Sequence, residues 1–134
     1  MEPHDIIARD FAKNHQGREY DEAHAHRVFD QYAAGGGKFL HLGNVLIFVT
    51  PLSLNCVEFH CMNGGTGAEL TEAVNTALGQ LSSHFDFAFT YYDNPRINAM
   101  MKFRKYPVEV SCINDGIDRT FEARFSLKGA SWVQ

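Results

Sequence analysis

The sequence has little of several features that mark particular classes of protein. Its three cysteines are an odd number with no C-x-x-C pair, which argues against a disulfide framework and a zinc ribbon. The longest apolar run, Val45 to Val49, is far shorter than the roughly 20 residues that span a membrane. The net charge of −4 at pH 7 gives no basic excess to attract nucleic acid or anionic lipid. We therefore expect no nucleic-acid or membrane partner.

The first residues also lack the signals of export. Met1 to Asp5 holds neither the basic segment nor the apolar run of a signal peptide, so we expect the protein in a reducing cytoplasm, with its cysteines as core thiols. What is present suits a soluble globular protein, because 45% of the 134 residues are hydrophobic and 21% are charged. This length suits one core, and we assign residues 1–134 to a single domain.

Periodicity predicts an alternation of helices and strands. Helical spacing of apolar residues predicts helices at 4–15, 20–34 and 67–83, and a fourth from Pro95 that is capped by Asn94 and ends before Pro107. Alternation predicts strands at 38–42, 45–50, 54–62, 85–92, 108–113 and 120–127, the second ended by Pro51. Turn residues predict hairpins at Gly43-Asn44 and Asn114-Asp115-Gly116. The order is α-α-β-β-β-α-β-α-β-β, in the α+β or α/β class. We expect the core to include Leu70, Val74, Leu78, Phe87 and Phe89, and one side of the fourth strand to carry Phe85, Phe87, Phe89 and Tyr91.

The stretch from Cys56 to Leu70 reads as a strand, a glycine-rich loop and the start of a helix. Thr66 and Glu69 have the spacing of a capping box, which places the start of the helix just after the glycines. A helix start presents unpaired backbone N–H groups, and glycines let a ligand approach the backbone, so the loop suits a phosphate or pyrophosphate. The alternative is that the loop only turns the chain. It matches neither common nucleotide-binding glycine motif, and Glu69 brings a negative charge to the same place.

The order of elements and this loop resemble the GNAT superfamily of N-acetyltransferases, over residues 4 to 127. The loop of that family is Q/R-x-x-G-x-G/A, and Met62-Asn63-Gly64-Gly65-Thr66-Gly67 supplies both glycines but has Met first. The family also tends to have an Asn after the next strand and a helix with Ala and Tyr four residues apart. Asn94, Ala99 and Phe103 stand at similar places, with Phe instead of Tyr. The two opening helices without a clear first strand are similar to short phage-encoded members.

The resemblance implies a GNAT-like mixed sheet flanked by helices and acetyl-CoA as the acyl donor. The strand before the loop and the next strand are then neighbours that splay apart, with the cofactor entering between them. The loop amides would hold the pyrophosphate of CoA and the end of the preceding strand its pantetheine arm. The residues expected at the cofactor are Phe59, Cys61, Met62, Asn63, Gly64, Gly65, Thr66, Gly67, Ala68, Asn94 and Phe103.

The leaving thiolate raises a separate question. The family Tyr is thought to protonate it, and Phe103 has no hydroxyl with which to do so. Tyr91, Tyr92 or Tyr106 are the candidate substitutes, and the alternative is a thiolate that leaves without help. We include Tyr91 among the expected catalytic residues.

A base near the acceptor is required because only a neutral amine attacks a thioester. Glu58 and His60 lie two residues apart on one strand, so they share a face just before the loop. His60 is the better candidate, since a histidine side chain titrates near neutral pH. The alternative is a histidine that is simply packed and hydrogen-bonded among aromatic residues.

The remaining polar groups suggest no further site. His24, His26, His41 and His60 match no zinc-ligand spacing, and we expect no metal. Arg96 and Lys102 belong to a basic helix face that is either solvated or placed near the ribose phosphate of CoA.

Two functional hypotheses follow. The first is an acetyl-CoA-dependent N-acetyltransferase that acts on an amine of a protein, peptide or small molecule. The second is a catalytically silent GNAT-like binding or structural protein, encoded by a phage and present in the host cytoplasm or the virion. The identity of the amine acceptor and the oligomeric state are left open by the sequence.

Overall fold

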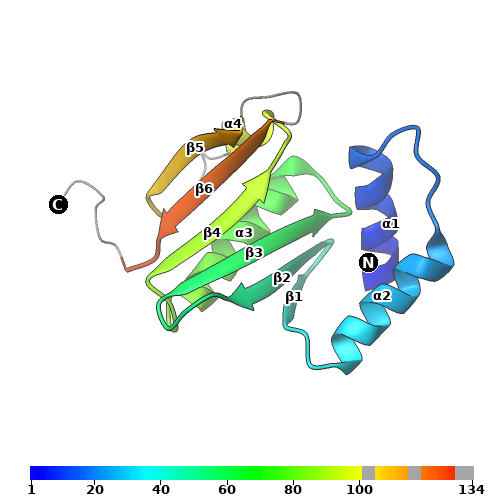
Figure 1. Cartoon of the computed structure of the whole chain (residues 1–134), viewed down its shortest axis with the longest axis horizontal. Coiled ribbons are helices and arrows are strands. Elements are labelled where there is room, and N and C mark those ends of the chain that lie inside the picture. Colours follow the sequence, from blue (N-terminus) through cyan, green and yellow to red (C-terminus); the bar gives the residue numbers. More distant parts are fainter. Residues whose placement is uncertain (101–104, 115–118, 129–134) are drawn as a thin grey trace.

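Six strands form one mixed sheet in the computed structural model, which describes residues 1–100, 105–114 and 119–128 (Figure 1). Their order across the sheet is β1-β2-β3-β4-β6-β5, and only the β3–β4 pair is parallel. This mixed arrangement confirms the expected fold class. The elements are α1 Pro3–Asn14, α2 Glu22–Ala34, β1 Phe39–Leu42, β2 Val45–Pro51, β3 Cys56–Asn63, α3 Gly67–Leu81, β4 Phe87–Tyr92, α4 Ile97–Met100, β5 Val108–Asn114 and β6 Thr120–Ser126.

The hydrophobic core lies between α3 and one face of the sheet. Leu78 of α3 is completely buried and packs with inward-facing residues of four strands. Alternation along each strand selects these residues, because side chains two positions apart point to the same face. From the strands the cluster takes Val45, Ile47, Val57, Phe59, Ala88, Ala123 and Phe125, and from α3 it takes Ala73, Ala77, Leu78 and Leu81.

Helices α1 and α2 pack on the opposite face, at the β1–β3 end of the sheet (Figure 1). The ring of Phe29 on α2 meets the rings of Phe39 and Phe48, with centroids 5.3 and 6.3 Å apart. Phe39 and Phe48 are cross-strand partners on β1 and β2, so one helix covers both strands. On the same side of the sheet, Ile6 of α1 and Leu46 of β2 are completely buried.

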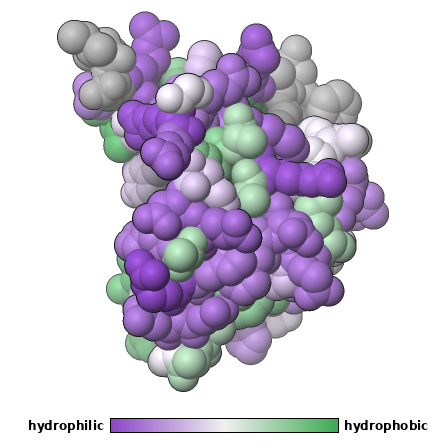
Figure 2. Space-filling model, turned by 90° about the vertical axis from the view of Figure 1, so that its right-hand side faces the viewer, coloured by the Kyte–Doolittle hydropathy of each residue, from purple (hydrophilic) through white to green (hydrophobic). Residues whose placement is uncertain are grey.

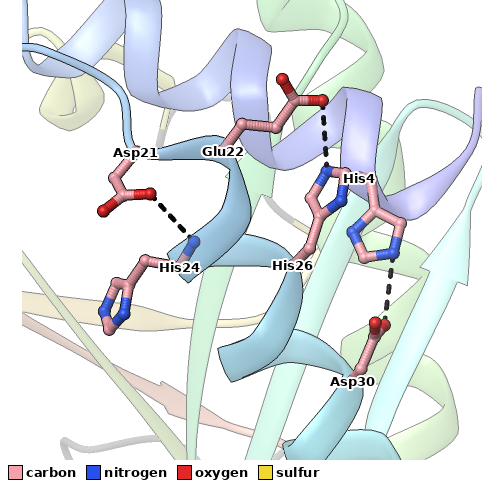
Figure 3. A network of polar contacts seen from close by, with 6 residues as sticks. All are labelled: His4, Asp21, Glu22, His24, His26 and Asp30. Atoms are coloured by element: carbon pink, nitrogen blue, oxygen red, sulfur yellow. Dashed lines mark hydrogen bonds and ion pairs between the residues drawn. The ribbon is translucent and has the colours of Figure 1, made fainter.

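A polar network joins α1 to α2 (Figure 3). The rings of His4 and His26 lie close together, with centroids 3.9 Å apart and planes tilted by 34°. His4 Nε2 is 3.2 Å from Asp30 Oδ1, and His26 Nε2 is 3.7 Å from Glu22 Oε1. His24 lies apart from this pair of rings, as expected for residues two apart on a helix (Figure 3). Within the described ranges, no three His, Cys, Asp or Glu residues are placed to hold a metal ion.

The prediction that the aromatic side of β4 faces the core is wrong. We expect Phe87 and Phe89 to be buried, yet both are only half-buried, and Ala88 between them is completely buried under α3. Phe85, predicted on the aromatic side, precedes the strand and packs against the α3 core. On β4 the side chain under α3 is the small Ala88, and the rings of Phe87 and Phe89 occupy the other face of the strand.

The predicted element boundaries that the structure describes hold within about two residues, and the differences have local causes. Leu54, expected in β3, is 99% exposed in the turn before it. Pro51 closes β2 rather than following it, as the last residue in register with β3. The fourth helix begins at Ile97 instead of Pro95, because Asn94 Oδ1 accepts from the Arg96 amide in a turn before the helix. Phe103 and Asp115-Gly116 lie outside the described residues.

The surface over α1 and α2 is mainly hydrophilic, with separate hydrophobic patches between polar side chains (Figure 2). Across the part of the chain that the structure describes, no helix has the length and apolar character needed to cross a membrane.

Candidate active site between two diverging strands

Strands β3 and β4 start as partners and then separate. Three register pairs join them: Cys56 with Phe87, Val57 with Ala88, and Glu58 with Phe89. Beyond these pairs β3 stays in register with β2 as far as Asn63, while β4 stays in register with β6 as far as Tyr92. The backbone edges of the two strands therefore face each other without a ladder between them. This is the splay that the family resemblance implies.

A cavity of about 450 Å³ occupies the region where the strands diverge. Its wall combines the ends of β3 and β4 with the first turns of α3 and the end of α1. The side chains are mixed in character, and both apolar and polar residues come from several elements. The lining residues are Asp10, Asn14, His15, Phe59, His60, Cys61, Met62, Leu70, Thr71, Val74, Asn75, Thr90, Tyr91, Tyr92, Asp93, Asn94, Ile97, Thr120 and Phe125.

The cavity explains why two predicted core residues are incompletely buried. Leu70 and Val74 of α3 are half-buried and line the cavity, whereas Leu78, one turn further along, is completely buried. The helix therefore changes role along its length. Its second half closes the core, and its first half forms one wall of an open space.

The glycine-rich loop beside the cavity has most of its amides already engaged. The N–H of Gly64 donates to Asn44 O at 2.8 Å, and that of Gly65 to Asn63 Oδ1 at 2.9 Å. The Thr66 N–H donates to Glu69 Oε1 at 3.0 Å and the Glu69 N–H to Thr66 Oγ1 at 3.2 Å, which is the predicted capping box.

Two amides at the start of α3 are left. In the described part of the chain, those of Gly67 and Ala68 donate to no protein acceptor. At the first two positions of a helix they lie at the positive end of its dipole. They are the loop amides that are free to meet an anion.

The three loop glycines serve different needs. A Cβ on Gly64 would lie 3.2 Å from Cα of Ile6, so this glycine lets α1 pack closely. A Cβ on Gly65 would lie 2.6 Å from a carboxylate oxygen of Glu69. A Cβ on Gly67 meets nothing within 4 Å, so only there is the backbone open to an approaching ligand.

Helix α1 holds the loop in place through two charged side chains. Asp10 Oδ1 accepts from the Asn63 amide at 2.9 Å. Lys13 Nζ donates to the carbonyl oxygens of Gly65 at 2.5 Å and Asn63 at 3.3 Å. Since Asp10 also lines the cavity, one helix both fixes the loop and forms part of the wall.

The carboxylate of Glu69 acts as a built-in anion at the start of α3. The Thr66 amide and then the side chain of Asn44, which donates at 2.7 Å, lower the pKa of Glu69. Lys13 adds a smaller electrostatic contribution in the same direction. The side chain is therefore negatively charged at neutral pH and close to the free amides of α3.

The predicted site residues fall into two groups. Those that line the cavity are Phe59, His60, Cys61, Met62, Tyr91 and Asn94, and those that do not are Glu58 and the loop residues from Asn63 to Ala68. Glu58 shares the side of the sheet with His60, as predicted, but it sits where β3 and β4 are still paired. Phe103 lies outside the described residues.

The two adjacent tyrosines of β4 project to opposite faces. Tyr91 is 37% exposed, on the face away from α3. Burial, followed by a hydrogen bond to Glu122 and the charges of Glu122 and Glu58, raises its pKa. Tyr92 is half-buried on the α3 face, where its hydroxyl donates to Asn98 Oδ1 at 2.5 Å.

Cys61 is the thiol in the cavity wall. Burial, with a contribution from the charge of Asp10, raises its pKa to about 12. The thiolate is the nucleophilic form, so Cys61 is a neutral thiol at physiological pH. It is suited to line a site and unsuited to form a covalent acyl intermediate.

Several cavity residues have no signal in the sequence. Asp10 and Asn14 belong to α1, His15 caps its end, and Thr120 belongs to the last strand. They meet at the cavity only after the sheet and α1 have packed together. No motif or spacing connects them with the glycine loop, so the sequence gives no signal that they belong to the site.

No protein-family model and no curated protein matches the sequence. Solved structures do resemble the fold. One is a spermidine N-acetyltransferase SpeG chimera from Vibrio cholerae and hSSAT, with a TM-score of 0.58, 10% identity, and coverage of 94% of this chain and 93% of that chain. Another is Ard1 from Thermoplasma volcanium, with a TM-score of 0.55, 12% identity, and coverage of 96% of this chain and 95% of that chain.

A third structure is a ribosomal-protein-alanine N-acetyltransferase from Brucella melitensis, with a TM-score of 0.50, 11% identity and 90% coverage of both chains. A phage origin finds no support among these proteins. Because identity is so low, the likeness is one of backbone arrangement. It shows that this chain has the GNAT-like fold of N-acetyltransferases.

Proposed function

We propose that this protein transfers an acetyl group from acetyl-CoA to an amine of a protein, peptide or small molecule. The observation that carries the proposal is the cavity between the diverging ends of β3 and β4, beside the open start of α3. A fold alone does not define an activity. The support for this activity is therefore what this particular cavity offers to a long thioester and an amine.

For the cofactor, the free backbone edge of β3 from Phe59 to Met62 suits the amides of a pantetheine arm. The unpartnered N–H groups of Gly67 and Ala68 are suited to donate hydrogen bonds to the oxygens of the pyrophosphate. Asn94 lines the cavity at the end of β4, on the other side of the arm. A cofactor bound along this route from the loop to the cavity has its thioester in the middle of the molecule. The compartment that we propose for the reaction is the cytoplasm, where acetyl-CoA is made.

For the acceptor, His60 is the base that we propose. Its side chain is exposed and lines the cavity, on the face of the sheet away from α3. Glu58, on the same face but outside the cavity, is placed to act on His60 or on an intervening water rather than on the amine. Removal of a proton from the ammonium gives the neutral nucleophile that a thioester requires.

One observation favours the alternative of a silent binding protein. Three of the five loop amides already donate within the protein, and Glu69 puts a negative charge beside the remaining two. A bound pyrophosphate would either be repelled by the Glu69 carboxylate or push that side chain away from the amides. Binding of CoA without turnover is the outcome that distinguishes this second function.

The direct test is calorimetric titration with acetyl-CoA and with CoA, followed by mass spectrometry of candidate amines. Binding of both, with a product that is heavier than the amine by the mass that acetylation adds, supports the transferase. Absence of any CoA binding contradicts the proposal.

The role of the amides is tested at Gly67. Gly67→Val adds branched bulk where a Cβ meets no protein atom, so the fold should stay intact while CoA binding weakens by at least about tenfold, or 1.4 kcal/mol. Gly67→Ala is the matched control with a smaller effect. Gly65→Val is a poor test, because its Cβ would strike Glu69. Equal CoA affinity in the wild type and Gly67→Val would show that the loop only turns the chain.

A further inference from the structure

A lysine of α1 lies against the glycine-rich loop, outside the cavity. Lys13 Nζ donates to the carbonyl oxygens of Gly65 at 2.5 Å and Asn63 at 3.3 Å. The side chain is exposed and, unlike Asp10 and Asn14 on the same helix, it does not line the cavity. An ammonium group has three N–H donors, so one of them remains for a ligand. Lys13 therefore brings an accessible positive charge to the loop.

Two other charged side chains hold the loop, and both are negative. Asp10 accepts from one of its amides, and Glu69 accepts from the Thr66 amide. After the hydrogen bonds from Thr66 and Asn44, the charge of Lys13 also lowers the pKa of Glu69, so the lysine and this carboxylate are close enough to interact. Without Lys13, an anion that approaches the loop would meet two carboxylates.

The free amides of the loop lie outside the cavity as well. Gly67 and Ala68, whose N–H groups have no protein acceptor in the described part of the chain, do not belong to the cavity wall. A cofactor whose acyl arm fills the cavity therefore has its phosphates at the loop, where Lys13 also lies. Two neutral amides beside the carboxylate of Glu69 do not compensate the negative charge of a pyrophosphate.

We infer that Lys13 supplies the positive charge that binds the pyrophosphate of CoA, a role that rests on the proposed acetyl transfer. Its ammonium keeps its contacts with the loop carbonyls and donates the remaining N–H to a phosphate oxygen, while the amides of Gly67 and Ala68 donate to the same group. Lysine binds phosphate in this way, as a point charge. The cation comes from α1 because Met62, the first position of the loop motif, is uncharged.

The test is calorimetric titration of the wild type and Lys13→Met with CoA and with 3′-dephospho-CoA, which keeps the pyrophosphate and lacks the ribose phosphate. Lys13→Met should raise the Kd for both ligands by about 10- to 100-fold, the range for a hydrogen bond to a charged group. Arg27→Gln, the matched control, removes a positive charge from an exposed position of α2 and should keep the wild-type Kd. Lys13→Arg keeps the charge and should bind CoA more tightly than Lys13→Met.

The salt dependence of binding separates a cation that contacts the cofactor from a lysine that only supports the loop. Added salt screens charges, so the Kd of the wild type for CoA should rise with NaCl concentration, and that of Lys13→Met should rise less steeply. A loop that had merely lost its support would bind CoA weakly with the wild-type salt dependence. Urea denaturation checks that Lys13→Met is folded, and the uncharged, polar Lys13→Gln serves the same comparison if it is not.

The outcomes distinguish this inference from the proposed function. An unchanged Kd for CoA in Lys13→Met, or a weaker one with the wild-type salt dependence, overturns the inference and leaves the transferase intact. A loss confined to CoA, with 3′-dephospho-CoA bound as tightly as by the wild type, places Lys13 at the ribose phosphate and overturns its assignment to the pyrophosphate. A wild type that binds neither ligand overturns the transferase itself.

Discussion

The first and second halves of the β3–β4 pair are built for different purposes. In the first half three register pairs join the strands, and Val57 and Ala88 are completely buried under α3. In the second half the same strands diverge around a cavity, and His60 is exposed. One pair of strands thus provides both a closed core and an open site. The comparison teaches that stability and chemistry can be changed separately, by substitutions a few residues apart.

The largest expected effect is on kcat, from a substitution in the diverging half of the β3–β4 pair alone. His60→Ala should lower kcat by about 10² to 10⁴, the usual value of a general base, with little change in CoA affinity or in the free energy of unfolding. The physical reason is that His60 is exposed and belongs to no buried cluster. Steady-state kinetics, CoA titration and urea denaturation measure the three quantities. A folded His60→Ala with the wild-type kcat would remove His60 as the base.

The second prediction breaks the closed half alone. Leu78→Ala removes a completely buried side chain and should lower the free energy of unfolding by about 2 to 5 kcal/mol. Thr76→Ala, at an exposed position of the same helix, should change it by less than about 0.5 kcal/mol. Urea denaturation gives both values. Folded Leu78→Ala should still bind CoA, and a selective loss of binding would show that the two halves are not independent.

The sequence predicts well the features that neighbouring residues determine. The capping box of Thr66 and Glu69 and the turn at Gly43, with its φ of +61°, depend on three or four consecutive residues. Even the splay follows once the resemblance orders the strands. Alternation also separated the two faces of β4 correctly. Alternation does not show which face of β4 the helix covers, and the prediction that Phe87 and Phe89 are core residues is wrong because Ala88 occupies the core face.

The contacts that the sequence could not reveal are long-range ones. Asp10 meets the Asn63 amide across 53 positions, and Lys13 meets Gly65 across 52. Nothing near Asp10 or Lys13 indicates such partners, because α1 reaches the loop only through packing on the sheet. The occupation of the loop amides by Asn63 and Glu69 is a related case, since a glycine pattern does not tell whether its amides are free.

The third prediction sharpens the comparison at the end of β3. Met62 lines the open half at the position where the resemblance expects Arg or Gln. Met62→Arg should tighten CoA binding by about 1 to 3 kcal/mol, the range for a hydrogen bond to a charged group, while Met62→Ala should change it little. Calorimetry compares the three proteins. An equal affinity for all of them would mean that the pyrophosphate does not come near this position.

The smallest effect is expected at Glu69, which lies where the open half meets the start of α3. Because hydrogen bonds from Thr66 and Asn44 lower the pKa of Glu69 in the folded chain, the charged form stabilises the fold. That stability is fully present above the unfolded pKa of about 4.3 and is lost as the pH falls through the lower folded pKa. Glu69→Gln should therefore be less stable than the wild type at pH 7, with a difference that closes below about pH 4.

The same substitution, Glu69→Gln, should weaken the stability of the fold but raise the affinity for CoA. Glu69→Gln keeps the length of the side chain and an oxygen for the Thr66 amide, so the capping box persists. It removes the negative charge beside the free amides of Gly67 and Ala68, and CoA affinity should rise at neutral pH. Glu72→Gln, exposed on the same helix, is the control for charge alone. Thermal melts from pH 3 to 8 and CoA titrations at pH 7 measure both effects. A Glu69→Gln variant that binds CoA more weakly would show that the carboxylate helps to form the anion site rather than competing for it.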